Sequence, residues 1–255
     1  MSGHLETLYD DTRLRIVDLL GGAGDDLLTA DVPACPSWRV RDVVGHLTGV
    51  GADVIDGKLE GMTTDAWTAA QVDARRDRPF DQVVEEWAQV GPKFAAMIDH
   101  FPGWYGRQVV ADITVHEHDV RGALGVAGDR DGDGLRQSLD LLVDVVMGAG
   151  ANALGVGPIE VIAGDSRWLV GGGSSSGGDV STAMNDAIAA GETPTPVDRP
   201  AEIRLTASPF ELFRAMTGRR SAEQIRRLDW SGDPSPYLPL FALGPFSLRA
   251  TDLDE

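Results

Sequence analysis

The chain has 255 residues and a formal net charge of −18 at pH 7, with 40 acidic residues against 22 basic ones. This acidity excludes the clustered basic face of a nucleic-acid-binding protein and disfavours adsorption to anionic lipid. The length suits one large domain or two modest ones, and a hydrophobic content of 42% is typical of a globular protein that buries a core.

The single cysteine, Cys35, permits no intramolecular disulfide, and such a chain suits a reducing interior. No apolar run approaches the roughly 20 residues that a bilayer span needs. The N-terminus also lacks the basic and apolar regions of a signal peptide. We therefore expect a cytoplasmic protein that binds neither nucleic acid nor a membrane.

The first half of the chain is predicted to form long amphipathic helices, because apolar residues recur there at spacings of three and four. The predicted helices cover residues 4–20, 38–57 (with Ser37 as the N-cap), 63–101 (interrupted at Arg78-Pro79) and 104–124. Helices of this kind in such number predict an antiparallel four-helix bundle, which we assign to residues 1–128.

The second half is mixed in pattern. It predicts a helix over 135–147, strands over 159–163, 167–170 and 202–206, and a helix over 210–217. Gly171–Gly178 predicts a low-complexity loop, and 179–200, which ends in a proline-rich run, is a poor candidate for regular structure. The predicted fold class is α+β, with a smaller α/β domain over residues 129–255.

Imidazole chemistry belongs to the first half, because all five histidines precede residue 119. On a helix, Asp112, His116 and Asp119 stand at positions i, i+4 and i+7, so their side chains project from one face. A carboxylate and an imidazole one turn apart can ligate one metal ion, and Asp119 can accept the other N–H of His116. His118 falls on another face of this helix.

A second histidine is predicted to point inward. His46 is framed by aliphatic residues in Val43–Leu47, and His116 shares an apolar stripe with Ile113. A single inward histidine is usually a hydrogen-bonded core residue, but two of them with an inward carboxylate require partners. His46, Asp112 and His116 form a His–Asp–His set with open coordination positions, which is typical of a catalytic metal site.

Two segments of the first half, Ser37–Leu47 and Asp112–Asp119, and two of the second, Phe210–Gln224 and Leu228–Pro234, resemble a known family. The family is that of the mycothiol-dependent maleylpyruvate isomerases. The first two segments resemble its DinB-like N-terminal four-helix domain, and the other two resemble its smaller, sterol-carrier-like C-terminal domain. The resemblance implies zinc, or another divalent metal, on His46, Asp112 and His116. The family pattern has Glu where this chain has Asp112, which is shorter by one methylene.

The resemblance also implies mycothiol as a thiol cofactor. A metal ion with open positions favours the thiolate form of such a thiol, which can add to an electrophilic alkene. The outcome is cis–trans isomerisation of a maleylpyruvate-type substrate or thiol S-transfer, so the expected partners are a small-molecule thiol and an electrophile. Arg219 and Arg220 are candidates for a bidentate clamp on a substrate carboxylate. The protein is expected to be a monomer or a homodimer.

Two other functions stay open from the sequence. One is a non-catalytic protein of the same fold that binds a metal or a small ligand. The other is a hydrolytic metal centre, which is disfavoured because Glu117 lies on a different helix face from His116. Cys35 lies on a proline-flanked loop with no histidine adjacent in sequence, so we interpret it as a bystander.

Two weaker motifs lie in the second half. Asp129–Asp140 places acids at positions 1, 3, 5 and 12 of an EF-hand-like loop, but Arg136 stands at its usual aliphatic position. Gly148–Ala153 is similar to a dinucleotide fingerprint, which requires a preceding strand where helical spacing is found. We therefore interpret the first as a linker and the second as a helix end.

Overall fold

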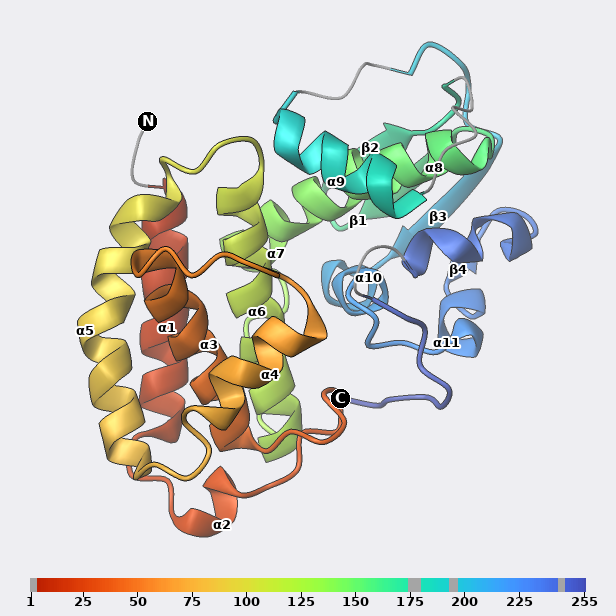
Figure 1. The fold of residues 1–255 in the computed structure, drawn as a ribbon. Coiled ribbons are helices and arrows are strands. Elements are labelled where there is room, and N and C mark those ends of the chain that lie inside the picture. The colour runs from red at the N-terminus through yellow and green to blue at the C-terminus, as the bar shows by residue number, and fades with distance from the viewer. Residues whose placement is uncertain (1–3, 174–179, 193–196, 243–245) are drawn as a thin grey trace. The chain divides into compact units, whose positions relative to one another are not determined.

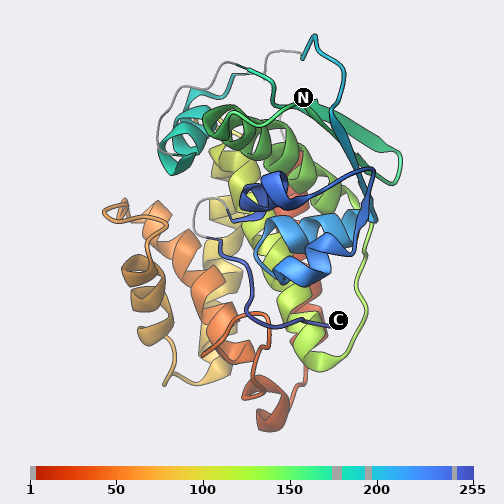
Figure 2. The ribbon, with the colours of Figure 1, turned by 90° about the vertical axis from the view of Figure 1, so that its right-hand side faces the viewer.

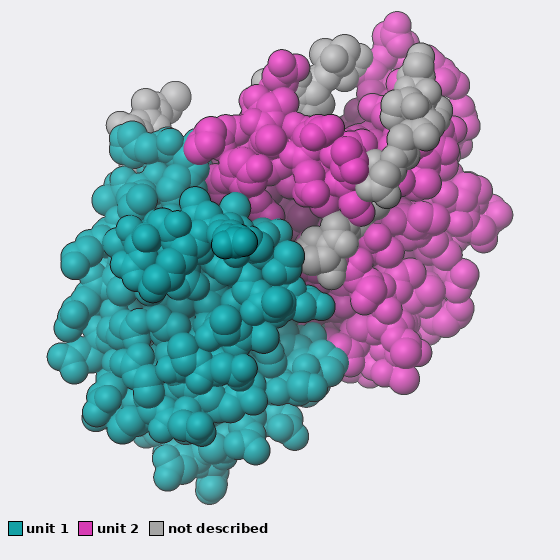
Figure 3. Space-filling view, viewed as in Figure 1, with its two compact units in different colours: residues 1–101, 112–128, 255 teal, residues 102–111, 129–254 magenta. Residues whose placement is uncertain are grey.

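The computed structural model describes residues 4–173, 180–192, 197–242 and 246–255. The chain divides into two compact units, coloured separately in Figure 3. Unit 1 comprises residues 1–101, 112–128 and 255, and unit 2 comprises residues 102–111 and 129–254. No helix within the described residues has both the length and the apolar character needed to cross a bilayer.

Unit 1 is helical. Its elements are α1 (His4–Leu20), α2 (Asp25–Leu28), α3 (Val40–Ile55), α4 (Asp65–Asp73), α5 (Phe80–Ile98) and the part of α6 (Tyr105–Leu124) from Asp112 onward. Figures 1 and 2 show α1, α3, α5 and α6 running alongside one another as a bundle. The interior is filled by large side chains such as Trp87 and Phe94, which are fully buried.

Helix α3 begins later than the sequence predicted. Ser37 is not its N-cap, because Ser37 has a left-handed backbone with φ +76° and α3 begins at Val40. Arg39 is the N-cap residue, and its backbone N–H donates to the Asp42 carboxylate at 2.9 Å. Asp42, the third residue of the helix, thus satisfies the backbone amide of the N-cap residue.

Glycines on α3 allow close packing on two sides. A Cβ on Gly51 would lie 2.8 Å from a side-chain carbon of Val90 on α5. A Cβ on Gly49 would lie 2.5 Å from Cβ of Gln71 on α4. Real side chains do not approach this closely, so α4 and α5 pack as they do because α3 has no side chain at these two positions.

Unit 2 contains a four-stranded sheet in the order β2-β1-β3-β4. Its strands are β1 (Ile159–Ala163), β2 (Ser166–Val170), β3 (Ile203–Ala207) and β4 (Asp229–Trp230). β1 pairs with β2 in an antiparallel hairpin and with β3 in parallel, and β3 pairs antiparallel with β4. Together with the helices, this sheet confirms the predicted α+β class.

The helices of unit 2 depart from the prediction in two places. They are α7 (Asp133–Leu139), the π-helix η1 (Asp140–Met147), α8 (Gly148–Leu154), α9 (Val180–Ala190), α10 (Pro209–Met216), α11 (Ala222–Arg226) and the 3-10 helix η2 (Ser235–Phe241). The helix expected over 135–147 changes from α to π geometry at Asp140. The stretch 179–200, expected to be irregular, contains α9, which buries Met184 and Ile188. Residues 174–179 and 193–196 lie outside the described residues.

Candidate metal centre

His46, Asp112 and His116 converge in unit 1. His46 comes from α3, and the other two come from successive turns of α6. One donor atom from each lies within 4.8 Å of the others. Nε2 of His46 is 3.7 Å from Oδ2 of Asp112, and Nε2 of His116 is 3.7 Å from Oδ1 of the same carboxylate.

The Nδ1 atoms of both histidines are held by hydrogen-bond acceptors. Nδ1 of His116 lies 3.0 Å from Oδ2 of Asp119, and Nδ1 of His46 lies 2.9 Å from Oε1 of Gln71. A carboxylate and an amide oxygen only accept hydrogen bonds, so Nδ1 carries the proton in both neutral rings. Each Nε2 therefore presents a lone pair toward Asp112.

This donor set fits a divalent metal ion. The 3.7 Å separations are too long for hydrogen bonds, so in the neutral rings two nitrogen lone pairs face an anionic carboxylate. Zinc holds nitrogen and carboxylate donors at about 2.0–2.2 Å, which places two ligand atoms of a tetrahedral site roughly 3.4 Å apart. The spacing is close to that value, and Asp112 offers a separate oxygen to each histidine despite lacking the methylene of Glu.

Asp112 is the solvent-exposed member of the ligand set, and Trp38 packs against the two buried imidazoles. The Asp112 side chain is 37% exposed, whereas the His46 and His116 side chains are almost fully buried. Trp38 lies against both imidazoles, with ring centroids 5.2 Å from His46 and 5.7 Å from His116. The indole thus limits the orientations available to both rings and shields them from water on that side.

Cys35, interpreted from the sequence as a bystander, lies beside this centre. Its Sγ donates to Oδ2 of Asp119 at 3.1 Å and is 4.0 Å from Nδ1 of His116. The loop before α3 folds back on itself, with a β-bridge between Asp31 and Arg39, and this tertiary arrangement brings Cys35 to α6. Sequence neighbours alone cannot report such a contact.

Glu117 belongs to an ion cluster. It accepts hydrogen bonds from Arg15 on α1 and from Arg121 one turn along α6. Burial acts to raise the pKa of Glu117, but these two arginines lower it by more, so the net pKa lies below its usual value. A carboxylate held in this way is a poor general base. Glu117, the glutamate on this helix, is therefore unsuited to activate water in a hydrolytic metal centre.

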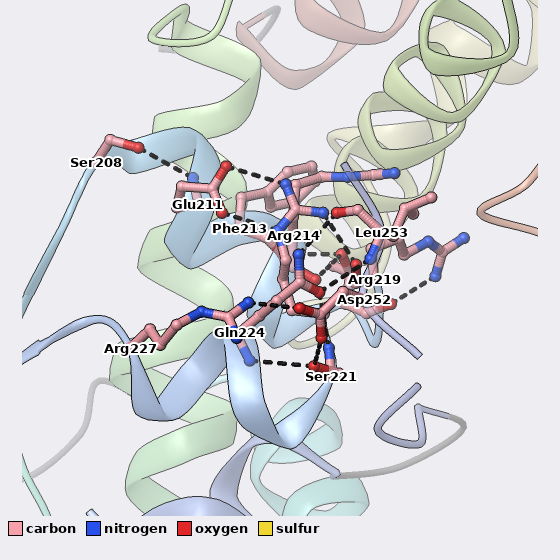
Figure 4. A network of polar contacts seen from close by, with 12 residues as sticks. Ser208, Glu211, Phe213, Arg214, Arg219, Ser221, Gln224, Arg227, Asp252 and Leu253 are labelled. Carbon is pink, nitrogen blue, oxygen red and sulfur yellow. Dashed lines mark hydrogen bonds and ion pairs between the residues drawn. The ribbon is translucent and has the colours of Figure 1, made fainter. Parts of the chain in front are cut away.

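Arg219 and Arg220 lie in unit 2. Figure 4 shows Arg219 and Glu211 within a network of polar contacts. Nε and Nη2 of Arg220 donate to the two oxygens of Glu211 at 2.8 and 3.0 Å. Nη1 of Arg219 donates to the carbonyl of Thr217. The fork of Arg220 is thus engaged by Glu211, and a substrate clamp at these residues stays a prediction.

The two weaker motifs do not form the sites that they resemble. Helix α7 begins at Asp133, so positions 5 to 12 of the Asp129–Asp140 segment are helical rather than looped around an ion. Asp131 is paired with Arg136 at 3.0 Å. Gly148–Ala153 belongs to α8 and follows the π-helix η1, not the strand that a dinucleotide site requires.

Two supporting residues were not found from the sequence. Gln71 and Trp38 contact the histidines directly, yet neither is recognisable from its own neighbours. One usable signal is the spacing of Gly45 and Gly49 on α3, because glycines four residues apart leave one helix face open to a close neighbour.

Comparison with known proteins points to one family. Residues 10–121 match the family model described as "Mycothiol maleylpyruvate isomerase N-terminal domain", which confirms the resemblance inferred from the sequence. A comparison with curated proteins found no match. Among solved structures, the chain is similar to a crystal structure of a histidine-to-alanine mutant of the mycothiol-dependent maleylpyruvate isomerase. The TM-score is 0.52, at 10% identity over 89% of this chain and 91% of that chain. At this identity, the likeness shows the fold alone.

Proposed function

We propose that this chain is a metal- and thiol-dependent enzyme, because residues 10–121 match the family model of the mycothiol maleylpyruvate isomerase N-terminal domain. Its reaction is the addition of a small-molecule thiol, such as mycothiol, to an electrophilic alkene, with isomerisation or S-transfer as the outcome. The observation that carries the proposal is the pair of histidines whose Nε2 lone pairs face one carboxylate, Asp112.

The residues of the proposed centre have separate roles. His46, Asp112 and His116 would hold a divalent metal, with zinc favoured by the two imidazoles and one carboxylate. Asp119 keeps the proton of His116 on Nδ1, away from the metal-facing nitrogen. When bound, the ion would supply positive charge that favours the thiolate form of a thiol cofactor.

A set of three protein ligands would leave one position of a tetrahedral ion open to a further ligand. Three protein ligands with a remaining position are typical of catalytic rather than structural zinc sites. The exposed part of Asp112 marks the side from which a small molecule can reach the set. Cys35 does not supply the nucleophile in this proposal, because its S–H is committed to Asp119.

The test is a reaction assay on the intact protein. Zinc-reconstituted protein is incubated with mycothiol and maleylpyruvate, and substrate, trans isomer and thiol adduct are followed by NMR. We expect isomer or adduct with the wild type, none without thiol, and a large loss with Asp112→Asn. Asp77→Asn, which removes an exposed acid elsewhere in unit 1, serves as the matched control and should behave as the wild type. Thiol binding with neither product would instead favour the non-catalytic binding protein.

A further inference from the structure

We propose that Gln71 is a positioning residue for His46 and that Asp53 sets the direction of the Gln71 amide. Gln71 belongs to α4, whereas the ligand set is carried by α3 and α6. The inference rests on the proposed function, because it assigns the role of Gln71 within the same metal centre.

The three residues form a chain of hydrogen bonds. Oε1 of Gln71 lies 2.9 Å from Nδ1 of His46, and Nε2 of Gln71 donates to Oδ2 of Asp53 at 3.0 Å. The Gln71 residue is 1% exposed, so its amide is shielded from water. Both ends of a buried amide are therefore used, as buried polar groups require.

Asp53, at the end of this series of hydrogen bonds, fixes which way the Gln71 amide points. The Asp53 carboxylate only accepts hydrogen bonds, so it selects the Gln71 orientation that presents NH₂ to it. That orientation turns Oε1 toward His46, and Oε1 can accept only from a protonated Nδ1. The metal-facing Nε2 of His46 is consequently left without a proton, which is the form that binds a metal.

The packing of α4 on α3 holds Gln71 in place. The absent side chain of Gly49 leaves the space that Cβ and Cγ of Gln71 occupy, since a Cβ at position 49 would lie 2.5 and 2.7 Å from them. Gly49 follows His46 by one helical turn, so the same face of α3 carries the imidazole and the surface on which Gln71 sits. Helix α4 thus provides Nδ1 of His46 with a hydrogen-bond acceptor, as α6 provides Nδ1 of His116 with Asp119.

The proposal is tested with Gln71→Met, which keeps the length of the side chain but removes the acceptor. Asp53→Asn is the second variant, because it removes the charge that orients the amide and leaves the volume unchanged. Gln89→Met, at an exposed position of α5, is the matched control. Two quantities are measured at one fixed pH: the tautomer of His46 in metal-free protein, by long-range proton–nitrogen NMR, and zinc affinity, by chelator competition.

We expect metal-free wild type and Gln89→Met to show His46 protonated on Nδ1, and Gln71→Met to show a mixture that includes the Nε2 tautomer. Zinc affinity should fall about 10- to 100-fold in Gln71→Met and by a smaller factor in Asp53→Asn. Should Gln71→Met fail to fold, Asp53→Asn gives the same readouts.

The outcomes separate this proposal from the proposed function. An unchanged His46 tautomer and an unchanged zinc affinity in both variants would overturn the role of Gln71, even if the wild type binds zinc and is active. A wild type that binds no zinc would contradict the proposed function. A tautomer change in Gln71→Met would still support the positioning of His46 by Gln71 in that case.

Discussion

Nδ1 of His116 lies 3.0 Å from Oδ2 of Asp119, whose side chain is completely buried. A buried carboxylate in this position fixes the tautomer of the imidazole and raises its basicity as a ligand. The two residues are three apart on α6, so the helix itself provides this pairing.

Replacing the carboxylate with an amide should therefore weaken metal binding. We expect Asp119→Asn to lower zinc affinity by about tenfold, because the amide oxygen still accepts the hydrogen bond but carries no full charge. The measurement is chelator competition, with Asp77→Asn as the control. An affinity equal to that of the wild type would show that Asp119 does not act through His116.

Cys35 should contribute through its hydrogen bond and not as a nucleophile. Cys35→Ser keeps a donor toward Asp119, so zinc affinity and thiol-dependent activity should stay within about threefold of the wild type. Activity is measured with mycothiol in excess after zinc reconstitution. Loss of product formation in Cys35→Ser, with zinc still bound, would instead identify Cys35 as a catalytic nucleophile.

A methyl group at Gly49 should disturb the metal centre from a distance. Gly49→Ala would drive Cβ into Gln71, so we expect the free energy of unfolding to fall by about 1–3 kcal/mol and zinc affinity to fall with it. Denaturant unfolding and chelator competition measure the two effects. The control is Gly24→Ala, where φ is negative and no atom lies within 4 Å of the added Cβ. Equal behaviour of the two variants would mean that α4 does not depend on Gly49.

Glu86 should make the free energy of unfolding depend on pH. Burial acts to raise its pKa, but hydrogen bonds from Arg75 and Arg78 lower it by more, so the folded pKa lies below the ordinary value of 4.5. The unfolded chain then binds more protons in acid, so the stability from this group is present above pH 4.5 and is lost as pH falls through the folded pKa.

Glu86→Gln tests this sign. We expect the variant to be less stable than the wild type by about 1–2 kcal/mol at neutral pH, with a difference that shrinks as the pH is lowered below 4.5. Urea unfolding at several pH values measures both. A difference that stays constant across this range would contradict the lowered pKa of Glu86.

Much of the fold follows from local pattern. Helix α1 covers the predicted residues 4–20, because its apolar spacing is regular and glycine follows its last residue. The inward faces that the sequence assigned to His46 and His116 are the faces that meet at Asp112. Each of these features depends on helical periodicity, which can be recognised within one continuous segment of the sequence.

The features that were missed depend on contacts between segments. Cys35 and Gln71 reach the centre only because a loop and a short helix fold onto α6 and α3, and no local period encodes that arrangement. The change to π geometry at Asp140 was also missed, because six of the eight residues from Asp140 to Met147 are buried and no single apolar face marks the change. Helix α9 was missed because its flanks are rich in glycine and proline, although its own residues suit a helix.

The central claim is that His46, Asp112 and His116 bind one divalent metal ion, and elemental analysis tests it most directly. Purified protein is loaded with zinc, freed of loosely bound metal by gel filtration, and assayed by mass spectrometry beside His116→Ala and His100→Ala. We predict about one zinc ion per chain in the wild type and in His100→Ala, and almost none in His116→Ala. Absence of bound zinc from the wild type, or equal zinc in the wild type and His116→Ala, would contradict it.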